Sequence, residues 1–177
     1  MKGPRAKIAI LVEDEYEDLE LWYPYYRLLE AGYEPVLVGP EAASYRSKHG
    51  YPAKASFSAA QLDPATVRGL VIPGGHAPDR LRRHPSVVEL VKGVFDQGGL
   101  VASICHGGSL LVSANVLHGR KATSFRSIEI DLINAGARYI DREVVVDGNL
   151  VTSRFPDDLP AFMRESLAVL ASLTKSD

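Results

Sequence analysis

Short runs of consecutive apolar residues alternate along the chain with stretches whose apolar residues recur every three or four positions. The runs predict buried strands of a parallel sheet, and the periodic stretches predict amphipathic helices. We expect strands at residues 7–12, 34–38, 70–72, 99–104, 143–146 and 149–153, and a small hairpin at residues 45–55. We expect helices at residues 17–31, 79–83, 86–97, 127–134 and 160–173. This alternation predicts an α/β fold, with a mostly parallel sheet and helices on both faces.

Two features of the expected helices can be tested. In the first helix an apolar stripe is expected to face the core, and it consists of Leu19, Trp22, Tyr23, Tyr26 and Leu29. Pro24 lies inside this helix and offers no N–H to the carbonyl of Glu20, which should distort the helix close to the end of the first strand. The helix at residues 86–97 is expected to begin with Ser86 as its cap.

The composition predicts one domain over residues 1–177. A net charge of −2 gives no general attraction to nucleic acid or to anionic membranes. No apolar run approaches the roughly 20 residues that a membrane helix needs. The single cysteine excludes an intrachain disulfide and a cysteine-based zinc cluster, and it fits a reducing compartment. We therefore expect a cytoplasmic protein that binds neither nucleic acid nor membrane.

The apolar run at residues 99–104 ends at Cys105, which is followed by His106, Gly107 and Gly108. This order is typical of a nucleophile elbow, in which a tight corner between a strand and a helix exposes the central side chain. The start of a helix and a neighbouring histidine favour the thiolate, so we expect the thiol pKa to lie below that of a free cysteine. The alternative is an ordinary buried thiol. We predict an active site at this corner, with Cys105 as the nucleophile.

Other chemical groups follow neighbouring strands, and the carboxyl ends of parallel strands meet at one edge of the sheet. Glu20, in the helix after the first strand, is a candidate hydrogen-bond partner of the sulfur, and Glu17 lies one turn before it. Gly74 and Gly75, after the third strand, allow backbone N–H groups to approach a substrate oxygen, and the amide of His106 is a second donor.

The imidazole of His106 could accept the thiol proton if an acid orients its other nitrogen. His106 directly follows the nucleophile, so we expect that acid to come from a distant part of the chain or from another chain. The remaining histidines are expected on surface loops, without metal-ligand spacing, and they are His49, His76, His84 and His118. We predict no metal and no cofactor.

Three other α/β classes fit the sequence less well. The loop after the first strand is acidic, and it would repel the phosphate that a flavodoxin-type loop binds. The third strand ends in Pro73 and glycine, where a receiver domain would carry an aspartate. A glutamine-hydrolysing amidotransferase needs a late histidine, and none follows His118.

Several motifs together resemble the ThiJ/PfpI family over residues 7–170. They are Glu17-Asp18-Leu19-Glu20, Lys48-His49-Gly50-Tyr51, and the segments at residues 73–80, 102–107 and 144–149. That family includes intracellular cysteine peptidases, bacterial general stress proteins and the Parkinson-associated deglycase. The resemblance implies a flavodoxin-like sandwich with a cysteine elbow, and a stress protein that hydrolyses peptides or glyoxal-type carbonyl adducts.

The resemblance also implies roles for individual residues. Cys105 is the expected nucleophile, Glu20 the glutamate that touches its sulfur, and Gly75 with His106 the oxyanion donors. In the peptidase of this family, an acid after the Pro-Gly-Gly loop completes a triad with the histidine across a subunit interface, and Asp79 stands at that place. We therefore expect a homodimer with the site near the interface, and larger rings built from such dimers stay open.

The chain departs from the family pattern at three positions. Asp79 stands where the peptidase has a glutamate, Gly108 where a proline is common, and Phe125 where the peptidase has a tyrosine. These changes shorten the acid and remove a hydroxyl near the site, but they leave the thiol in place. The rival hypothesis is a redox sensor or chaperone-like stress protein that acts through oxidation of Cys105 and turns over no substrate.

Overall fold

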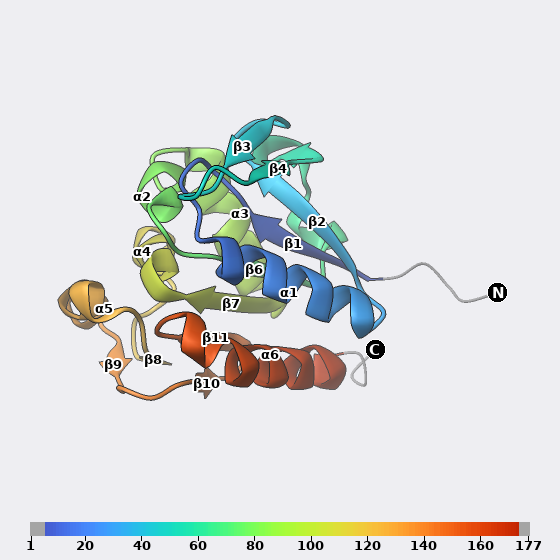
Figure 1. Cartoon of the computed structure of the whole chain (residues 1–177). Helices are drawn as coiled ribbons and strands as arrows, with labels where there is room; N and C mark the ends of the chain where they lie inside the picture. Colours follow the sequence, from blue (N-terminus) through green and yellow to red (C-terminus); the bar gives the residue numbers. More distant parts are fainter. Residues whose placement is uncertain (1–5, 174–177) are drawn as a thin grey trace.

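Seven strands form one sheet in the order β10-β11-β7-β6-β1-β2-β5 in the computed structural model, which describes residues 6–173 (Figure 1). All neighbouring strands in this sheet run parallel except β10, which pairs antiparallel with β11 at one edge. The strands are β1 (Lys7–Leu11), β2 (Glu34–Gly39), β5 (Phe57–Ser58), β6 (Gly69–Ile72), β7 (Leu100–Ile104), β10 (Val145–Asp147) and β11 (Leu150–Ser153). The mostly parallel sheet confirms the predicted fold class.

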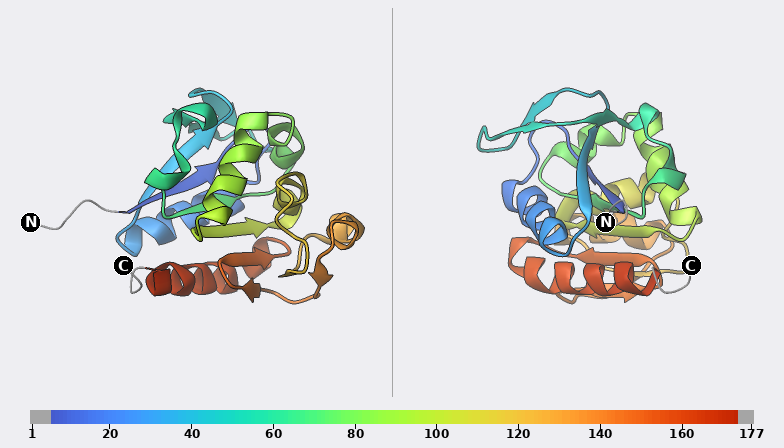
Figure 2. Two further views of the ribbon diagram at one scale, coloured as in Figure 1. Left: turned by 180° about the vertical axis from the view of Figure 1, so that it is seen from behind. Right: turned by 90° about the vertical axis from the view of Figure 1, so that its right-hand side faces the viewer.

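Helices cover both faces of this sheet (Figures 1 and 2). Helices α1 (Asp18–Glu30) and α6 (Leu159–Leu173) lie side by side on one face, and α3 (Pro85–Asp96) covers the other. Next to α3 lies α4 (Gly108–Ser113), which packs against α2 (Ala77–Leu81). Helix α5 (Glu129–Asn134) projects at one end of the molecule (Figure 1). None of the helices within residues 6–173 is long and apolar enough to cross a membrane.

Shorter elements complete the chain. Strands β3 (Ser44–Arg46) and β4 (Pro52–Lys54) form the small hairpin that was predicted, and β8 (Lys121–Ala122) pairs with β9 (Arg138–Tyr139). Between residues 6 and 173 the chain also forms five short 3₁₀ helices: η1 (Ala59–Gln61), η2 (Pro64–Thr66), η3 (Cys105–Gly107), η4 (Arg126–Ile128) and η5 (Pro156–Asp158).

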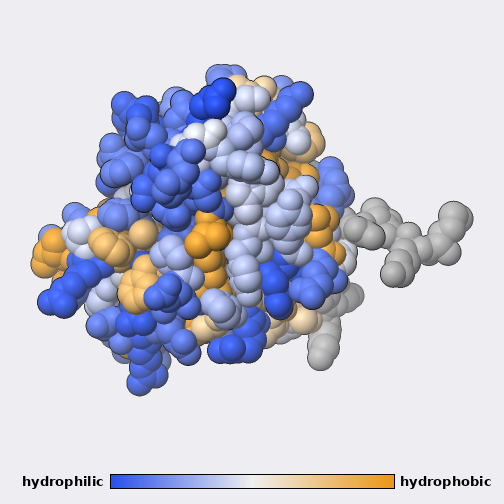
Figure 3. All heavy atoms as spheres, in the orientation of Figure 1, coloured by the Kyte–Doolittle hydropathy of each residue, from blue (hydrophilic) through white to orange (hydrophobic). Residues whose placement is uncertain are grey.

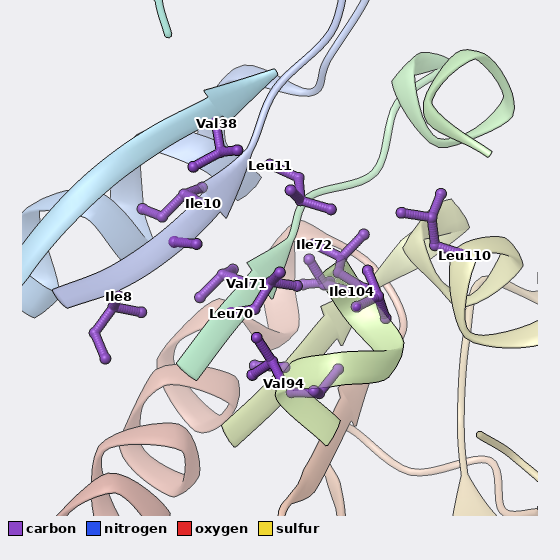
Figure 4. Packing of buried hydrophobic residues seen from close by; sticks show 14 of the residues in the cluster. Ile8, Ile10, Leu11, Val38, Leu70, Val71, Ile72, Val94, Ile104 and Leu110 are labelled. Atoms are coloured by element: carbon purple, nitrogen blue, oxygen red, sulfur yellow. The ribbon is translucent and has the colours of Figure 1, made fainter. Parts of the chain in front are cut away.

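The core lies on the two faces of the central strands, as Figure 4 shows. Every residue of β6 and β7 is buried, which explains why these strands are continuous apolar runs. Ile8 and Ile10 of β1 pack beside Leu70 and Val71 of β6 in this cluster. The surface is mostly hydrophilic, with an apolar area where α5 projects (Figure 3), and Ile130 and Ile133 of this helix are exposed.

The expected buried face of α1 is wrong. Leu19 and Tyr26 are 58% and 62% exposed, whereas Glu20, Leu21 and Leu28 are buried. The rotation of the helix places a carboxylate where the apolar pattern predicts a hydrophobic side chain. A buried carboxylate is costly unless it is hydrogen-bonded, and Glu20 accepts a 2.7 Å hydrogen bond from a backbone N–H of the loop after β6.

The aromatic residues of α1 instead pack on one another. The Trp22 ring meets those of Tyr25, in the same helix, and Tyr51, in the loop before β4, edge-on, at 5.5 and 5.7 Å between centroids.

The predicted start of the helix at residues 86–97 is also wrong, because the cap lies two residues before Ser86. His84 occupies the cap position of α3, and Pro85 is its first residue, where a missing N–H has no cost.

The order of the strands indicates at which edge of the sheet a ligand would bind. Read along the parallel strands, β2-β1-β6-β7-β11, the connections change direction between β1 and β6. Open α/β sheets bind their ligands at the carboxyl ends of the strands beside such a point. Glu20 lies in the first turn of α1 after β1, Gly75 lies in the loop after β6, and Cys105 directly follows β7, so all three lie at this edge.

Candidate active site

Cys105 occupies a strained corner at the end of β7. Its φ is +60°, in the left-handed region that residues other than glycine, asparagine and aspartate seldom adopt. Such strain persists only where the surroundings enforce it. Here the carbonyl of Cys105 accepts a 3.2 Å hydrogen bond from the N–H of Phe125, and the side chain is only 9% exposed. The predicted elbow geometry is therefore present.

The loop after β6 approaches this corner closely because it consists of glycines. A Cβ atom at Gly74 would lie 2.5 Å from Glu20 Oε2 and 2.7 Å from the Cβ of Cys105. Gly75 has a φ of +78°, and a Cβ there would lie 2.5 Å from the carbonyl of Glu15. The backbone N–H groups of Gly75 and His106 both lower the pKa of the Cys105 thiol, so both lie close to the sulfur. These are the two residues predicted as oxyanion donors.

Glu20 is fully buried beside the sulfur. Its Oε2 atom accepts from the N–H of Gly74, and its Oε1 atom has no hydrogen-bond partner in the part of the chain that the structure describes. Burial raises the pKa of Glu20 to about 7, against the opposing effect of the Gly74 N–H. The nearby charge of Glu17 raises this pKa as well. The carboxyl can therefore hold a proton near neutral pH.

The expected low pKa of the thiol is wrong. Burial raises the pKa of Cys105 to about 12, and the negative charge of Glu20 raises it further. The N–H groups of His106 and Gly75 lower the pKa of the thiol but do not outweigh burial. The thiol therefore keeps its proton until a base removes it. Because the sulfur and Glu20 interact, a proton on one of them makes ionisation of the other easier.

His106 is the base within reach of the sulfur. Its Nδ1 atom lies 3.3 Å from Cys105 Sγ, and its Nε2 atom lies 3.1 Å from the hydroxyl oxygen of Ser127. The ring of Phe125 stacks on the imidazole at 4.9 Å between centroids. Burial, followed by the charges of His76 and Lys48, lowers the pKa of His106. The imidazole is therefore neutral at neutral pH.

No acid of this chain meets His106 within residues 6–173. Asp79 is exposed on α2, and its neighbour Arg80 pairs with Glu15 at 3.3 Å. The predicted contact between Asp79 and His106 requires a second chain and stays a prediction. The sequence pattern did not indicate Ser127, because it lies 21 residues after His106 in a segment predicted only as the start of a helix.

Glu17 lies at the rim of the site in a small charged cluster. It pairs with Lys48 at 2.9 Å, and the adjacent Asp18 pairs with His49 at 2.7 Å. Ligand atoms of Glu17, Asp18 and His49 lie within 4.8 Å of one another, a grouping that the sequence spacing did not show. Glu17 is already engaged in an ion pair with Lys48, and Asp18 in a hydrogen-bond contact with His49.

The arrangement combines four functions within one corner. It brings together a thiol, an imidazole 3.3 Å from its sulfur, two backbone N–H groups and a buried carboxyl, which are the groups that acyl transfer through a cysteine requires. A cavity of about 420 Å³ lies beyond Ser124 and Phe125, and neither Cys105 nor His106 lines it.

Known proteins share this sequence and fold. The sequence pattern of the DJ-1/PfpI family matches residues 6–169. The chain is 48% identical over 164 residues to the deglycase PfpI of Pyrococcus furiosus, which covers 93% of this chain and 99% of that protein. It is 42% identical over 168 residues to general stress protein 18 of Bacillus subtilis, which covers 93% and 97% of the two chains.

The fold is also similar to that of a solved structure. A two-domain protein of Anabaena variabilis, with DJ-1/ThiJ/PfpI-like and ferritin-like domains, matches with a TM-score of 0.92 and 41% identity. The match covers 94% of this chain and 48% of that protein. The family that the motifs predicted is thus confirmed: this chain belongs to the DJ-1/PfpI family.

Proposed function

We propose that this protein is a cysteine-dependent hydrolase of the PfpI type that acts on glyoxal-type carbonyl adducts or on peptides as part of a stress response. The proposal rests on the corner itself, in which Cys105 has a φ of +60° and its sulfur lies 3.3 Å from Nδ1 of His106, with the glycine loop after β6 packed against it. The relatives named a deglycase and a general stress protein support the same class of activity. The single thiol fits work in the cytoplasm.

The proposed reaction begins with transfer of the thiol proton to Nδ1 of His106 as Sγ attacks the substrate carbonyl carbon. A C–S bond forms, and the carbonyl π electrons move to the oxygen, which accepts from the N–H groups of Gly75 and His106. With a peptide, the C–N bond then breaks as His106 returns the proton to the leaving amine. Water hydrolyses the resulting thioester and restores the thiol. With a glyoxal-type adduct, reversal of the adduct frees the aldehyde. The sulfur adds to its carbonyl carbon and His106 returns the proton to the oxygen, which gives a hemithioacetal on Cys105. A proton shift from that carbon to the neighbouring carbonyl carbon converts it into a thioester, which water hydrolyses to a 2-hydroxy acid and the free thiol.

The protonation state of Glu20 determines how easily Cys105 forms a thiolate. An ionised carboxylate beside Sγ opposes formation of a thiolate, whereas a protonated carboxyl can donate a hydrogen bond to it. The unpartnered Oε1 atom is free to carry that proton. The active form in this proposal therefore has neutral Glu20 and neutral His106, a combination that exists only between the pKa values of the two groups.

We also propose that the protein works as a homodimer with the loop of residues 73–83 at the subunit contact. Asp79 is exposed on that loop and lies beside the charged residues Arg80, Arg82 and Arg83. Charged residues of this kind suit the rim of an interface. In this arrangement Asp79 approaches the site of the other chain.

The test is a comparison of the wild type with Cys105→Ser on three substrates: methylglyoxal, its adduct with N-acetylcysteine, and a fluorogenic peptide. We expect turnover by the wild type and a turnover rate lower by roughly 1,000-fold or more in the variant. A serine hydroxyl is a far weaker nucleophile than a cysteine thiol near neutral pH. Full activity of the variant would overturn the role of Cys105. Absence of turnover by both proteins would overturn the enzyme proposal in favour of the redox sensor.

A further inference from the structure

The imidazole of His106 is held on three sides by its own chain. Cys105 Sγ lies at its Nδ1 edge, Ser127 Oγ lies at its Nε2 edge, and the Phe125 ring covers one face. Phe125 and Ser127 both belong to residues 124–128, which we call the histidine clamp. The N–H of Phe125 donates to the carbonyl of Cys105, so the clamp is tied directly to the elbow.

The packing around Gly108 shows that the clamp is built into the fold. A Cβ atom at Gly108 would lie 3.2 Å from the terminal methyls of Ile128 and Leu132, and 3.4 Å from the Cβ of Ser124. The missing side chain therefore lets the clamp lie close to the start of α4. Tyr139 adds a further tie, because its hydroxyl donates a 2.9 Å hydrogen bond to the carbonyl of Ser124.

The proposed reaction needs one tautomer of the ring. A neutral imidazole has one N–H and one bare nitrogen. To take the thiol proton, Nδ1, which lies 3.3 Å from the sulfur, must be the bare nitrogen. Nε2 then carries the hydrogen and can donate a hydrogen bond to Ser127 Oγ, 3.1 Å away. This tautomer leaves the lone pair of Nδ1 facing the proton that must be removed.

We propose that Ser127 is a positioning residue that holds His106 in this tautomer and orientation, in the place that an acid takes in a catalytic triad. The inference rests on the proposed role of His106 as the base. A neutral hydroxyl fixes the ring without adding negative charge to a site that already contains Glu20. The groups whose charges act on His106 are His76 and Lys48, from the loops after β6 and β3.

The test measures the thiol directly, so it does not depend on turnover. Cys105 is the only cysteine, and its second-order rate constant with iodoacetamide at pH 7.5 reports proton removal at this one site. We expect Ser127→Ala to lower this constant about fivefold, the effect of losing one ordinary hydrogen bond. Ser127→Thr keeps the hydroxyl and should stay within about twofold of the wild type. Ile130→Ala, an exposed residue of α5, is the matched control and should leave the rate unchanged.

A second comparison separates positioning from a structural role. In a His106→Ala background, Ser127→Ala should have no further effect on the rate if Ser127 acts through the imidazole. An effect of the same size in both backgrounds would overturn the proposal, and so would wild-type reactivity of Ser127→Ala. NMR of the unmodified protein provides a test without any variant, since Nε2 must carry the hydrogen in the neutral ring. A hydrogen on Nδ1 would contradict the inference.

The same experiments distinguish this inference from the proposed function and from the dimer contact. If Cys105→Ser keeps full turnover, the proposed role of Cys105 in turnover fails, while the effect of Ser127 on alkylation of the wild-type thiol still stands. If Asp79→Asn slows alkylation and Ser127→Ala does not, the partner's Asp79 rather than Ser127 holds the ring, and the inference is overturned.

Discussion

Replacing Glu20 by glutamine should change the way in which the stability of the protein depends on pH. The carboxyl is fully buried, and its pKa is raised from the ordinary value of 4.5 to about 7. The folded chain therefore keeps a proton that the unfolded chain releases between these two values. Because the unfolded state binds fewer protons in this range, the free energy of unfolding falls as the pH rises from about 4.5 to about 7, and levels off above it.

The size of this fall follows from the two pKa values. The difference between 4.5 and about 7 corresponds to roughly 3 kcal/mol, at ~1.36 kcal/mol for each pKa unit. Glutamine is neutral at every pH and keeps an oxygen that can accept from the N–H of Gly74. The Glu20→Gln variant should therefore lose this part of the decline. Relative to the wild type, it should gain about 3 kcal/mol between pH 4.5 and pH 8.

Urea unfolding of both proteins at several values between pH 4.5 and pH 8 measures the effect. Other titrating groups are common to the two proteins, so the difference between their unfolding free energies isolates Glu20. The difference between the two unfolding free energies should grow with pH up to about 7 and then stay constant. Parallel curves for the two proteins would refute it, and so would a variant that loses stability relative to the wild type at high pH.

Three other predictions concern the rest of the site. Gly75→Ala places a Cβ among backbone atoms at a φ of +78° and displaces an oxyanion donor, so it should cost at least ~1 kcal/mol of stability and about 100-fold in turnover, measured by urea unfolding and steady-state kinetics. Sedimentation of the wild type at micromolar concentration should show a dimer, and Asp79→Asn should weaken it; a monomeric wild type would contradict the subunit contact. Mild peroxide should oxidise Cys105 before the buried Met163, as read by peptide mass spectrometry; the reverse order would show that the sulfur is closed to oxidants.

Much of the fold could be predicted from the sequence because the central strands are buried on both faces. Strands of that kind are continuous apolar runs. The apolar runs of β1, β6 and β7 therefore begin and end close to where the strands do. The rotation of α1 could not be predicted in this way. Glu20 is buried because of a hydrogen bond to Gly74, 54 residues away, and such a contact has no trace in local periodicity.

In the candidate site, too, the features with a local sequence signature could be predicted, and those that depend on tertiary packing could not. Cys105 and Gly75 were identified because a tight corner and a glycine loop have local sequence signatures. The raised pKa of the thiol depends on how deeply the surrounding chain buries it, and local sequence does not show burial. Ser127 was missed for a similar reason, since only the packing of the clamp on Gly108 brings it to His106.

In the proposed mechanism Cys105 forms a covalent bond to the substrate during turnover. This bond can be detected by rapid acid quenching of the wild type with a peptide ester in excess, followed by intact-mass and peptide mass spectrometry. We expect an acyl group on the peptide that contains Cys105, formed before steady-state product appears, and no acyl group on Cys105→Ser. Turnover without any modification of Cys105, or an acyl group on another residue, would contradict the account.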